Sequence, residues 1–386
     1  MLALVEPIAV SPPLPARPSH ASESRIPELD GFRAIAALAV LVTHALFAFG
    51  RIEGALDGVP GAIITILSKG WLGVDLFFVL SGLLISGILI DSREKPHYFR
   101  NFYLRRVLRI MPLYFVTLAV CWYFYGASYS GFFLFTVFFM ANFASAFGVA
   151  LPHGPGVYWS LAVEEHFYLI WPLGARFLSR NALGVSALAI WLGSPVLRGL
   201  AAANNWVTTD QIYEFSCFRF DGLALGALLA IWWRSAAQTR QRSLQLAAGM
   251  VALSVVMTVV GLPFGILGTK TVASTALRYS QVQLIFGAAI LAALTLRGSA
   301  VTAVLRSGFL RLTSDYSYCI YMVHLSLGDA YVTLLKKAGV DTVAQFGPRL
   351  ALAMQVVAII GSTYLLAALS KRFLEDPFLR LKHRFA

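Results

Sequence analysis

Long apolar runs separated by short polar connections make up most of the chain. Eleven runs stand out, at 32–50, 70–91, 110–125, 130–147, 158–178, 183–200, 217–233, 244–262, 281–297, 313–335 and 350–371. A helix needs about 20 residues to cross the hydrocarbon core of a bilayer, and most of these runs reach that length. The pattern therefore predicts an all-α fold, a polytopic transmembrane helix bundle.

The bundle is expected to occupy residues 29–378. Residues 1–28 are rich in Pro, Ser and Ala, and we expect them to form a disordered cytoplasmic tail. No basic stretch precedes the short apolar start of this segment, which argues against a cleaved signal peptide. Residues 379–386 are expected to form a short basic cytoplasmic tail.

Lysine and arginine gather in alternate connections, and their distribution sets the predicted orientation. Residues 93–109 contain six of them. Further basic connections lie at 176–180, 234–242 and 297–311. All of these can face one side of the membrane only if 110–125 and 130–147 do not both span it. We therefore predict about ten spans, with 130–147 re-entrant or along the outer interface, and both termini in the cytoplasm.

The composition agrees with a membrane protein. Of the 386 residues, 58% are hydrophobic and 13% are charged, whereas soluble domains have roughly 25% charged residues. This excludes a soluble globular protein and a disordered one. The net charge of +12 would suit a nucleic-acid partner, but the basic residues lie between apolar runs, so topology explains them and no such partner is predicted. No metal-binding motif is present in the sequence, and no metal is expected.

The first motif with chemical potential pairs Arg33 with His44. The eleven positions between them correspond to about three helical turns plus 20°, so both side chains face the same way, and His44 lies about 16 Å deeper. A histidine near the bilayer midplane is costly unless it faces a polar cavity or a partner. We favour a functional role, with a structural hydrogen bond between helices as the alternative.

A second motif runs from Gly70 to Gly82 at the start of a span. Its carboxylate, Asp75, is a functional candidate because charged groups inside a membrane usually serve function, although a structural ion pair with Arg219 is the alternative. The glycines are expected to allow close helix packing.

A third motif places Arg105, Arg106 and Arg109 within one helical turn at the membrane rim. Guanidinium groups bind phosphate oxygens bidentately, so the cluster suits a phosphate-bearing ligand. The alternative is that these arginines only set topology and contact anionic lipid headgroups.

A fourth motif puts Glu164, Glu165 and His166 inside an apolar helix. Adjacent residues point about 100° apart, so the two glutamates cannot both face one site, and at least one is expected to be functional. Further along the chain His324 shares a helix face with Tyr318 and Tyr321, and we expect it to pack or to form hydrogen bonds.

Taken in order, these motifs resemble the acyltransferase-3 family of integral membrane acyltransferases, over about residues 26–378. The family's Arg and His separated by ten residues match Arg33 and His44, and its Arg-x-x-Arg pattern matches Arg106 and Arg109. Other family positions match Gly73, Asp75, Phe77, Phe78, Ser81, Gly82, Trp159, Ser160, Leu161 and Glu164. The chain departs from the family at Leu76, usually Phe, and at His166, more often Gln.

The resemblance implies a ten-span enzyme of the bacterial plasma (inner) membrane that moves an acyl group from acyl-CoA, expected to be acetyl-CoA, to a hydroxyl of a cell-surface glycan. It also implies the stand-alone form, without a C-terminal esterase-like domain. We expect Arg33, Arg105, Arg106 and Arg109 to bind the phosphates of the donor. His44 would act as general base or as transient acyl carrier.

Two further roles follow from this scheme. Glu164 would orient His44 or the acceptor, and Asp75 is expected in the acceptor-side half of the catalytic site.

The leading alternative is a transporter or flippase for a polar or glycolipid solute, which also needs charges inside the membrane. Against it, the polar motifs crowd into the first 172 residues without a mirrored set later. A non-catalytic scaffold would not need these buried charges.

Overall fold

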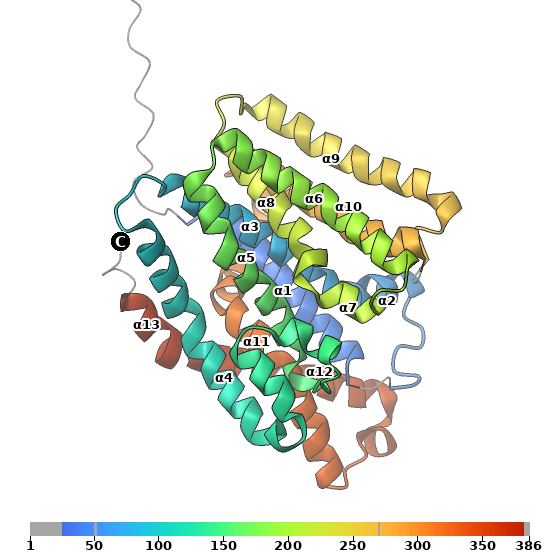
Figure 1. The fold of residues 1–386 in the computed structure, drawn as a ribbon. Coiled ribbons are helices and arrows are strands. Elements are labelled where there is room, and N and C mark those ends of the chain that lie inside the picture. The colour runs from blue at the N-terminus through green and yellow to red at the C-terminus, as the bar shows by residue number, and fades with distance from the viewer. Residues whose placement is uncertain (1–24, 50–51, 269–270, 382–386) are drawn as a thin grey trace, which may run out of the picture.

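The computed structural model describes residues 25–49, 52–268 and 271–381. Helices account for nearly all of this part of the chain (Figure 1). They are α1 Pro27–Phe47, α2 Gly61–Ser68, α3 Gly73–Asp91, α4 Tyr98–Val137, α5 Tyr158–Phe177, α6 Arg180–Ala203, α7 Thr209–Glu214, α8 Ser216–Trp233, α9 Arg240–Gly261, α10 Val272–Thr295, α11 Gly308–Lys337, α12 Thr342–Ser370 and α13 Asp376–Leu381.

The helices confirm the prediction of an all-α polytopic bundle. Nine helices in the described residues are long and apolar enough to cross a membrane. The helix α5 has 20 residues but contains two glutamates, which lower its hydropathy, and it lies among the others. Most of the predicted tails, residues 1–24 and 382–386, lie outside the described residues.

The chain reverses direction just before residues 130–147, the segment predicted to be re-entrant or to lie along the outer interface. The helical φ/ψ of α4 is interrupted at Tyr129 (φ −132°, ψ 32°). The hydroxyl of Tyr114 donates to the carbonyl oxygen of Thr136 at 2.6 Å, yet 22 residues of straight helix would separate the two by about 33 Å. The chain therefore reverses near Tyr129, and a 3₁₀ segment, Ala141–Phe147, follows. Because of this reversal, 130–147 does not add an eleventh span.

Basic connections that are far apart in the sequence meet at one end of the bundle. Arg234 pairs with Asp91 at 2.5 Å, and Arg180 donates to the carbonyl oxygen of Arg234 at 3.0 Å. Arg306 reaches back to Glu28, at the start of α1, at 2.9 Å. We call this the basic end. The predicted alternation of basic connections agrees with these contacts.

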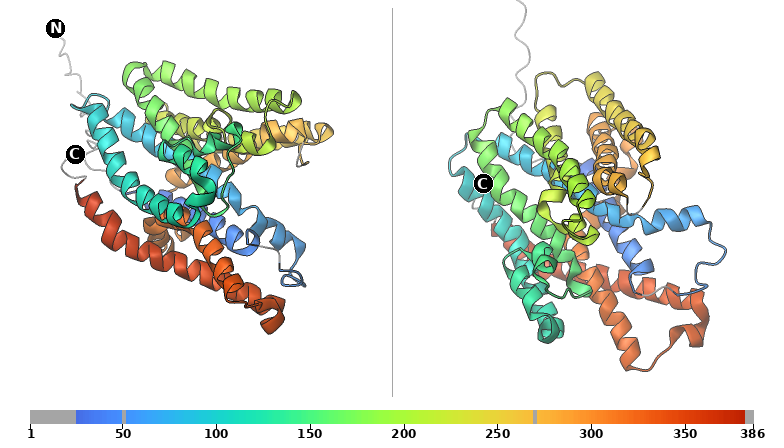
Figure 2. Two further views of the ribbon diagram at one scale, coloured as in Figure 1. Left: turned by 60° about the horizontal axis from the view of Figure 1, so that its bottom comes forward. Right: turned by 45° about the vertical axis from the view of Figure 1, so that its right-hand side comes forward.

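The two most buried spans of the bundle are those that contain α3 and α8. In the span that contains α3, 72% of the most apolar window is buried, against 22% for α9, which lies at the edge next to α10 (Figures 1 and 2). Two glycines bring α3 and α8 into backbone contact, as expected for the glycines of the second motif. A Cβ atom at Gly82 would lie 2.0 Å from the Leu223 carbonyl oxygen, and one at Gly226 would lie 2.2 Å from that of Val79.

Candidate active site

A polar cavity opens among α1, α3, α4, α5 and α11 near the basic end. Its volume is about 410 Å³. The polar residues that line it are Arg25, Asp30, Arg33, Ser81, Arg106, Arg109, Ser160, Glu164, Tyr168, Ser317, Tyr318 and Tyr321. Four arginines therefore face two carboxylates. A void with surplus positive charge inside an apolar bundle is suited to an anionic ligand.

Three of the four arginines predicted to bind the donor line this cavity. Arg33 comes from α1 and lies 3.6 Å from Asp30, while Arg106 and Arg109 come from α4. Within the described part of the chain, no carboxylate lies within ion-pair distance of Arg106 or Arg109. The fourth, Arg105, is not among the residues that line the cavity.

The carboxylate of Glu164 is held in the cavity by two hydroxyl groups. Ser81 donates to Oε1 at 3.0 Å and Tyr168 donates to Oε2 at 2.7 Å. The guanidinium of Arg106 stacks over the ring of Tyr168, 4.5 Å from its centroid. Ser81 belongs to the Ser-Gly pair of the second motif, but neither Ser81 nor Tyr168 was assigned a role from the sequence, because each acts through a partner on another part of the fold.

As predicted, the neighbouring carboxylate points elsewhere. Glu165 does not line the cavity, and its Oε1 is buried with no hydrogen-bond partner among the described residues. His166 bonds to the hydroxyl of Ser216 at 2.6 Å, also away from the cavity. The helical angle between adjacent residues thus separates Glu164 from Glu165.

The partner of His44 is a second histidine. His44 Nδ1 lies 2.8 Å from His324 Nε2, and the two rings stack with 5.0 Å between centroids. His324 is the seventeenth of the 30 residues of α11, close to the middle of the bundle. The expected hydrogen-bonding role of His324 is confirmed, but its contact with His44 joins positions 280 residues apart and was not predicted.

The hydrogen bonds of this pair fix where its protons lie. His324 Nδ1 is 2.8 Å from the carbonyl oxygen of Tyr321 and 3.1 Å from that of Ile320, and carbonyl oxygens only accept, so Nδ1 holds a proton. In neutral His324, Nε2 is then bare and accepts from His44 Nδ1–H. The lone pair of neutral His44 is therefore on Nε2, which can act as a base or a nucleophile.

Tyr321 connects this pair to the cavity. Its hydroxyl is hydrogen-bonded to Ser160, and both residues line the cavity. Its ring centroid is 5.9 Å from that of His324. Although His44 itself does not line the cavity, the histidine pair lies directly behind the wall formed by Tyr321.

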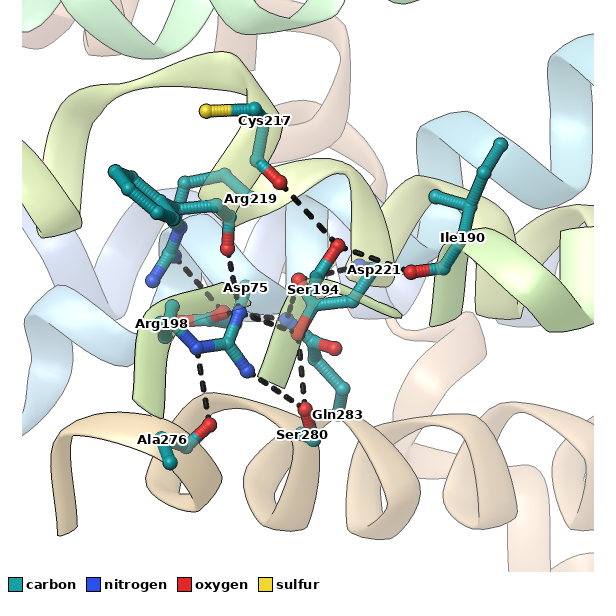
Figure 3. A network of polar contacts seen from close by, with 12 residues as sticks. Asp75, Ile190, Ser194, Arg198, Cys217, Arg219, Asp221, Ala276, Ser280 and Gln283 are labelled. Atoms are coloured by element: carbon teal, nitrogen blue, oxygen red, sulfur yellow. Dashed lines mark hydrogen bonds and ion pairs between the residues drawn. The ribbon is translucent and has the colours of Figure 1, made fainter. Parts of the chain in front are cut away.

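Asp75 lies in a separate, fully buried polar network (Figure 3). Arg219 donates to Asp75 at 2.9 Å and Arg198 donates to Asp221 at 2.8 Å, and all four side chains are 0% exposed. The amide of Gln283 donates to both carboxylates, at 3.1 and 3.0 Å, and so joins the two pairs. The ion pair weighed as an alternative is thus present, and the catalytic role of Asp75 stays a prediction.

The sequence profile of the acyltransferase-3 family, described as an acyltransferase domain, matches residues 26–370. The chain belongs to this family. The match covers all residues that line the cavity except Arg25, together with the histidine pair and the buried network of this acyltransferase, and it confirms the resemblance of the four motifs.

Two relatives are similar over part of their length. The peptidoglycan O-acetyltransferase OatA of Listeria monocytogenes serovar 1/2a is 29% identical over 245 residues, which are 56% of this chain and 35% of the relative. The O-acetyltransferase OatA of Staphylococcus aureus strain NCTC 8325 is 27% identical over 226 residues, 54% of this chain and 35% of the relative. The matched region thus spans about a third of each relative. No solved structure matches this chain.

Proposed function

We propose that this membrane acyltransferase is an O-acetyltransferase that takes its acetyl group from acetyl-CoA and places it on a hydroxyl of a cell-surface glycan. The observation that carries the proposal is the convergence of Arg33, Arg106 and Arg109 with Glu164 on one cavity. Two of these arginines lack a carboxylate partner within the described residues, so the phosphates of the donor would supply the missing negative charge by charge-assisted hydrogen bonds.

The proposed orientation puts the basic end and both termini in the cytoplasm of a bacterial cell, in its inner membrane. The donor then enters the cavity from the cytoplasmic side. Its flexible arm would carry the thioester past Tyr321 towards His44. Both roles of His44 use Nε2, the nitrogen that its hydrogen bond to His324 leaves bare.

As general base, His44 Nε2 takes the hydroxyl proton while the hydroxyl oxygen bonds to the acetyl carbon and the thiolate of CoA leaves. As acyl carrier, Nε2 itself bonds to the acetyl carbon and CoA leaves as the thiolate. The hydroxyl oxygen then bonds to the acetyl carbon, the bond between that carbon and Nε2 breaks, and the freed Nε2 takes the hydroxyl proton. Glu164 would position the donor or the acceptor beside Arg106. The glycan acceptor is supported by the relatives named for O-acetylation, one of them for peptidoglycan.

Purified protein in detergent, radiolabelled acetyl-CoA and candidate glycans test the proposal. We expect label to reach the glycan with the wild type and not with His44→Ala. His97→Asn, at an exposed position outside the site, is the matched control. Movement of an unmodified solute without label transfer would favour the transporter alternative, and transfer by His44→Ala at the wild-type rate would exclude His44 from the mechanism.

A further inference from the structure

A second histidine site lies at the end of the bundle opposite the basic end. His153, in the connection before α5, has its Nδ1 2.8 Å from Asp329 Oδ1 in α11. The hydroxyl of Tyr125 in α4 donates to the other carboxylate oxygen at 3.2 Å. The side chain of Asp329 is 20% exposed, whereas that of His153 is 54% exposed. The carboxylate is thus on the inside and the imidazole faces outward.

This site lies further along α1 and α11 than the His44–His324 pair. Asp329 follows His324 by five residues, and Phe49, whose ring centroid is 5.5 Å from that of His153, follows His44 by five residues. The two helices run in the same direction, because contacts join Glu28 to Arg306 near their starts and His44 to His324 further along. Five residues of helix correspond to about 7.5 Å. The site therefore lies beyond the histidine pair, away from the cavity.

The chemistry of His153 is fixed by its carboxylate partner. A carboxylate only accepts hydrogen bonds, so Nδ1 of His153 carries a proton. In the neutral ring Nε2 is then an acceptor, and it has no hydrogen-bond partner among the described residues. A histidine whose Nδ1–H is held by a partly buried aspartate has a fixed ring orientation, as in the Ser-His-Asp triad, where the other ring nitrogen accepts a hydrogen bond from the hydroxyl of the catalytic serine. A ligand at this site would therefore meet His153 Nε2, which can accept a hydrogen bond from a hydroxyl group, beside the aromatic ring of Phe49. This combination suits a sugar.

The connection around His153 is held closely against this carboxylate. A Cβ atom at Gly154 would lie 2.6 Å from Asp329 Oδ2 and 2.8 Å from the hydroxyl of Tyr125. A side chain at this position would displace the Asp329 carboxylate and the Tyr125 hydroxyl from their present places. Tyr125 itself comes from α4 just before its reversal at Tyr129. The fold-back and the glycine together position the imidazole ring.

We propose that His153, held by Asp329, is the acceptor-binding residue of this acyltransferase, and that its Nε2 accepts a hydrogen bond from a sugar hydroxyl of the glycan. This inference rests on the proposed function, since it names the acceptor side of the same reaction. The hydroxyl is bound about one and a half helical turns from the His44–His324 pair. The donor and the acceptor then approach the pair from opposite ends of α11.

The test uses the full chain in its host strain, after deletion of the host copy. His153→Leu removes both hydrogen bonds, whereas the amide of His153→Gln can donate to Asp329 and its oxygen can accept from a hydroxyl. Acetate released from surface glycans by mild base reports transfer, and radiolabelled acetyl-CoA bound by isolated membranes reports the donor site. We expect the Leu variant to lose about tenfold in glycan acetate and the Gln variant to retain most of it.

Acetyl-CoA binding is expected to stay at the wild-type level in both variants, and His97→Asn is the control for an exposed histidine elsewhere. Wild-type glycan acetate in the Leu variant would overturn the inference and leave the proposed function intact. If both variants lost acetyl-CoA binding as well as transfer, His153 would have a structural role only, and this result would also overturn the inference. Equal glycan acetate with and without the protein would instead overturn the proposed function.

Discussion

The cavity at the basic end and the buried network of Figure 3 use the same residue types in opposite ways. In the network two arginines face two aspartates, each pair is within 2.9 Å, and none of the four is exposed. In the cavity four arginines face two carboxylates around about 410 Å³ of open space. The carboxylate of Glu164 is satisfied there by the hydroxyl groups of Ser81 and Tyr168.

The charged groups of the buried network thus stabilise the fold, whereas those of the cavity are arranged to bind a ligand. In the network each buried charge faces an opposite one, although Nε and Nη1 of Arg219 and Oδ2 of Asp75 have no hydrogen-bond partner among the described residues. Removal of one member leaves an uncompensated charge in the bundle. Around the cavity Arg33 already lies 3.6 Å from Asp30, whereas Arg106 and Arg109 have no carboxylate within ion-pair distance among the described residues and can pair with an anionic ligand. Substitutions in the network should therefore lower stability, and substitutions around the cavity and the histidine pair should lower activity. The predictions below test this division, from the largest effect to the smallest.

The largest effect is expected at the histidine pair. His44→Ala should lower acetyl transfer by about 10²–10⁴-fold, the usual contribution of a proton-transfer group. Its thermal unfolding midpoint in detergent should stay close to that of the wild type. A strongly lowered midpoint would show that His44 stabilises the fold. This result would contradict the expectation that the histidine pair affects activity and not stability.

Within the network, Arg219→Met should destabilise the protein by about 3–5 kcal/mol, because Asp75 is left buried and unpaired. The double variant with Asp75→Leu removes both charges and should recover most of the stability. Thermal unfolding in detergent measures both variants. If the double variant regains the wild-type midpoint but remains inactive while Arg219→Met alone keeps activity in its folded fraction, Asp75 has the catalytic role predicted from the sequence in addition to its ion pair.

Around the cavity, Arg106→Ala should raise the KM for acetyl-CoA by about tenfold to a hundredfold, because one or two charge-assisted hydrogen bonds to phosphate are lost. The unfolding midpoint should hardly change. Lysine at this position should recover part of the affinity as a point charge without the bidentate geometry. An unchanged KM would mean that Arg106 is occupied with Tyr168 or with lipid headgroups.

At His324 the hydrogen bond should matter more than the ring. His324→Leu removes the acceptor for His44 Nδ1–H and should lower kcat by about tenfold, since the lone pair of His44 is then free to lie on either nitrogen. His324→Gln retains an acceptor oxygen and should recover most of kcat. The KM for acetyl-CoA should be the same in both, measured from initial rates. Equal kcat in the two variants would contradict a role for this hydrogen bond.

The smallest effect is expected at His153 and Asp329, as a change in the pH dependence of acetyl transfer. The hydrogen bond to Asp329 raises the pKa of His153 above its ordinary value of 6.5. Among the described residues, Asp329 is hydrogen-bonded to His153, Tyr125 donates to the other carboxylate oxygen of Asp329, and Phe49 packs against the imidazole ring. As pH falls through the raised pKa, Nε2 becomes protonated and stops accepting a hydroxyl, so transfer should decline, and His153→Gln should lack this decline.

The same ionisation should affect stability with the opposite sign. Because the folded-state pKa is raised, protonated His153 contributes stability below about pH 6.5, and this contribution is lost as pH rises through the raised pKa. Unfolding midpoints over this pH range, compared between the wild type and His153→Gln, check the sign. A wild-type midpoint that rises with pH relative to the Gln variant would contradict it.

The spans and the reversal near Tyr129 were predictable because they depend on local properties of the chain. Bilayer thickness fixes the length of an apolar run, and the alternation of basic connections shows which run cannot span. The members of the cavity, Arg33, Arg106, Arg109 and Glu164, followed from motif spacing and resemblance. Helical angles alone separated Glu164 from Glu165.

The contacts across the bundle could not be predicted in the same way. His44 meets His324, and Asp329 meets His153, through the packing of helices that are remote in the sequence. Helix periodicity tells which face of α11 is polar, but it does not tell which neighbour that face meets. The ion pair between Asp75 and Arg219 was weighed only as an alternative to a functional role of Asp75, on the general ground that charged groups inside a membrane usually pair with an opposite charge.

The backbone contact between α3 and α8 has a consequence for how anything crosses this membrane. Carriers move solutes when one group of helices rocks against another. Helices that touch at Gly82 and Gly226, and that share a buried ion pair, cannot slide without breaking both. We therefore expect α3 and α8 to move as one unit, if they move at all.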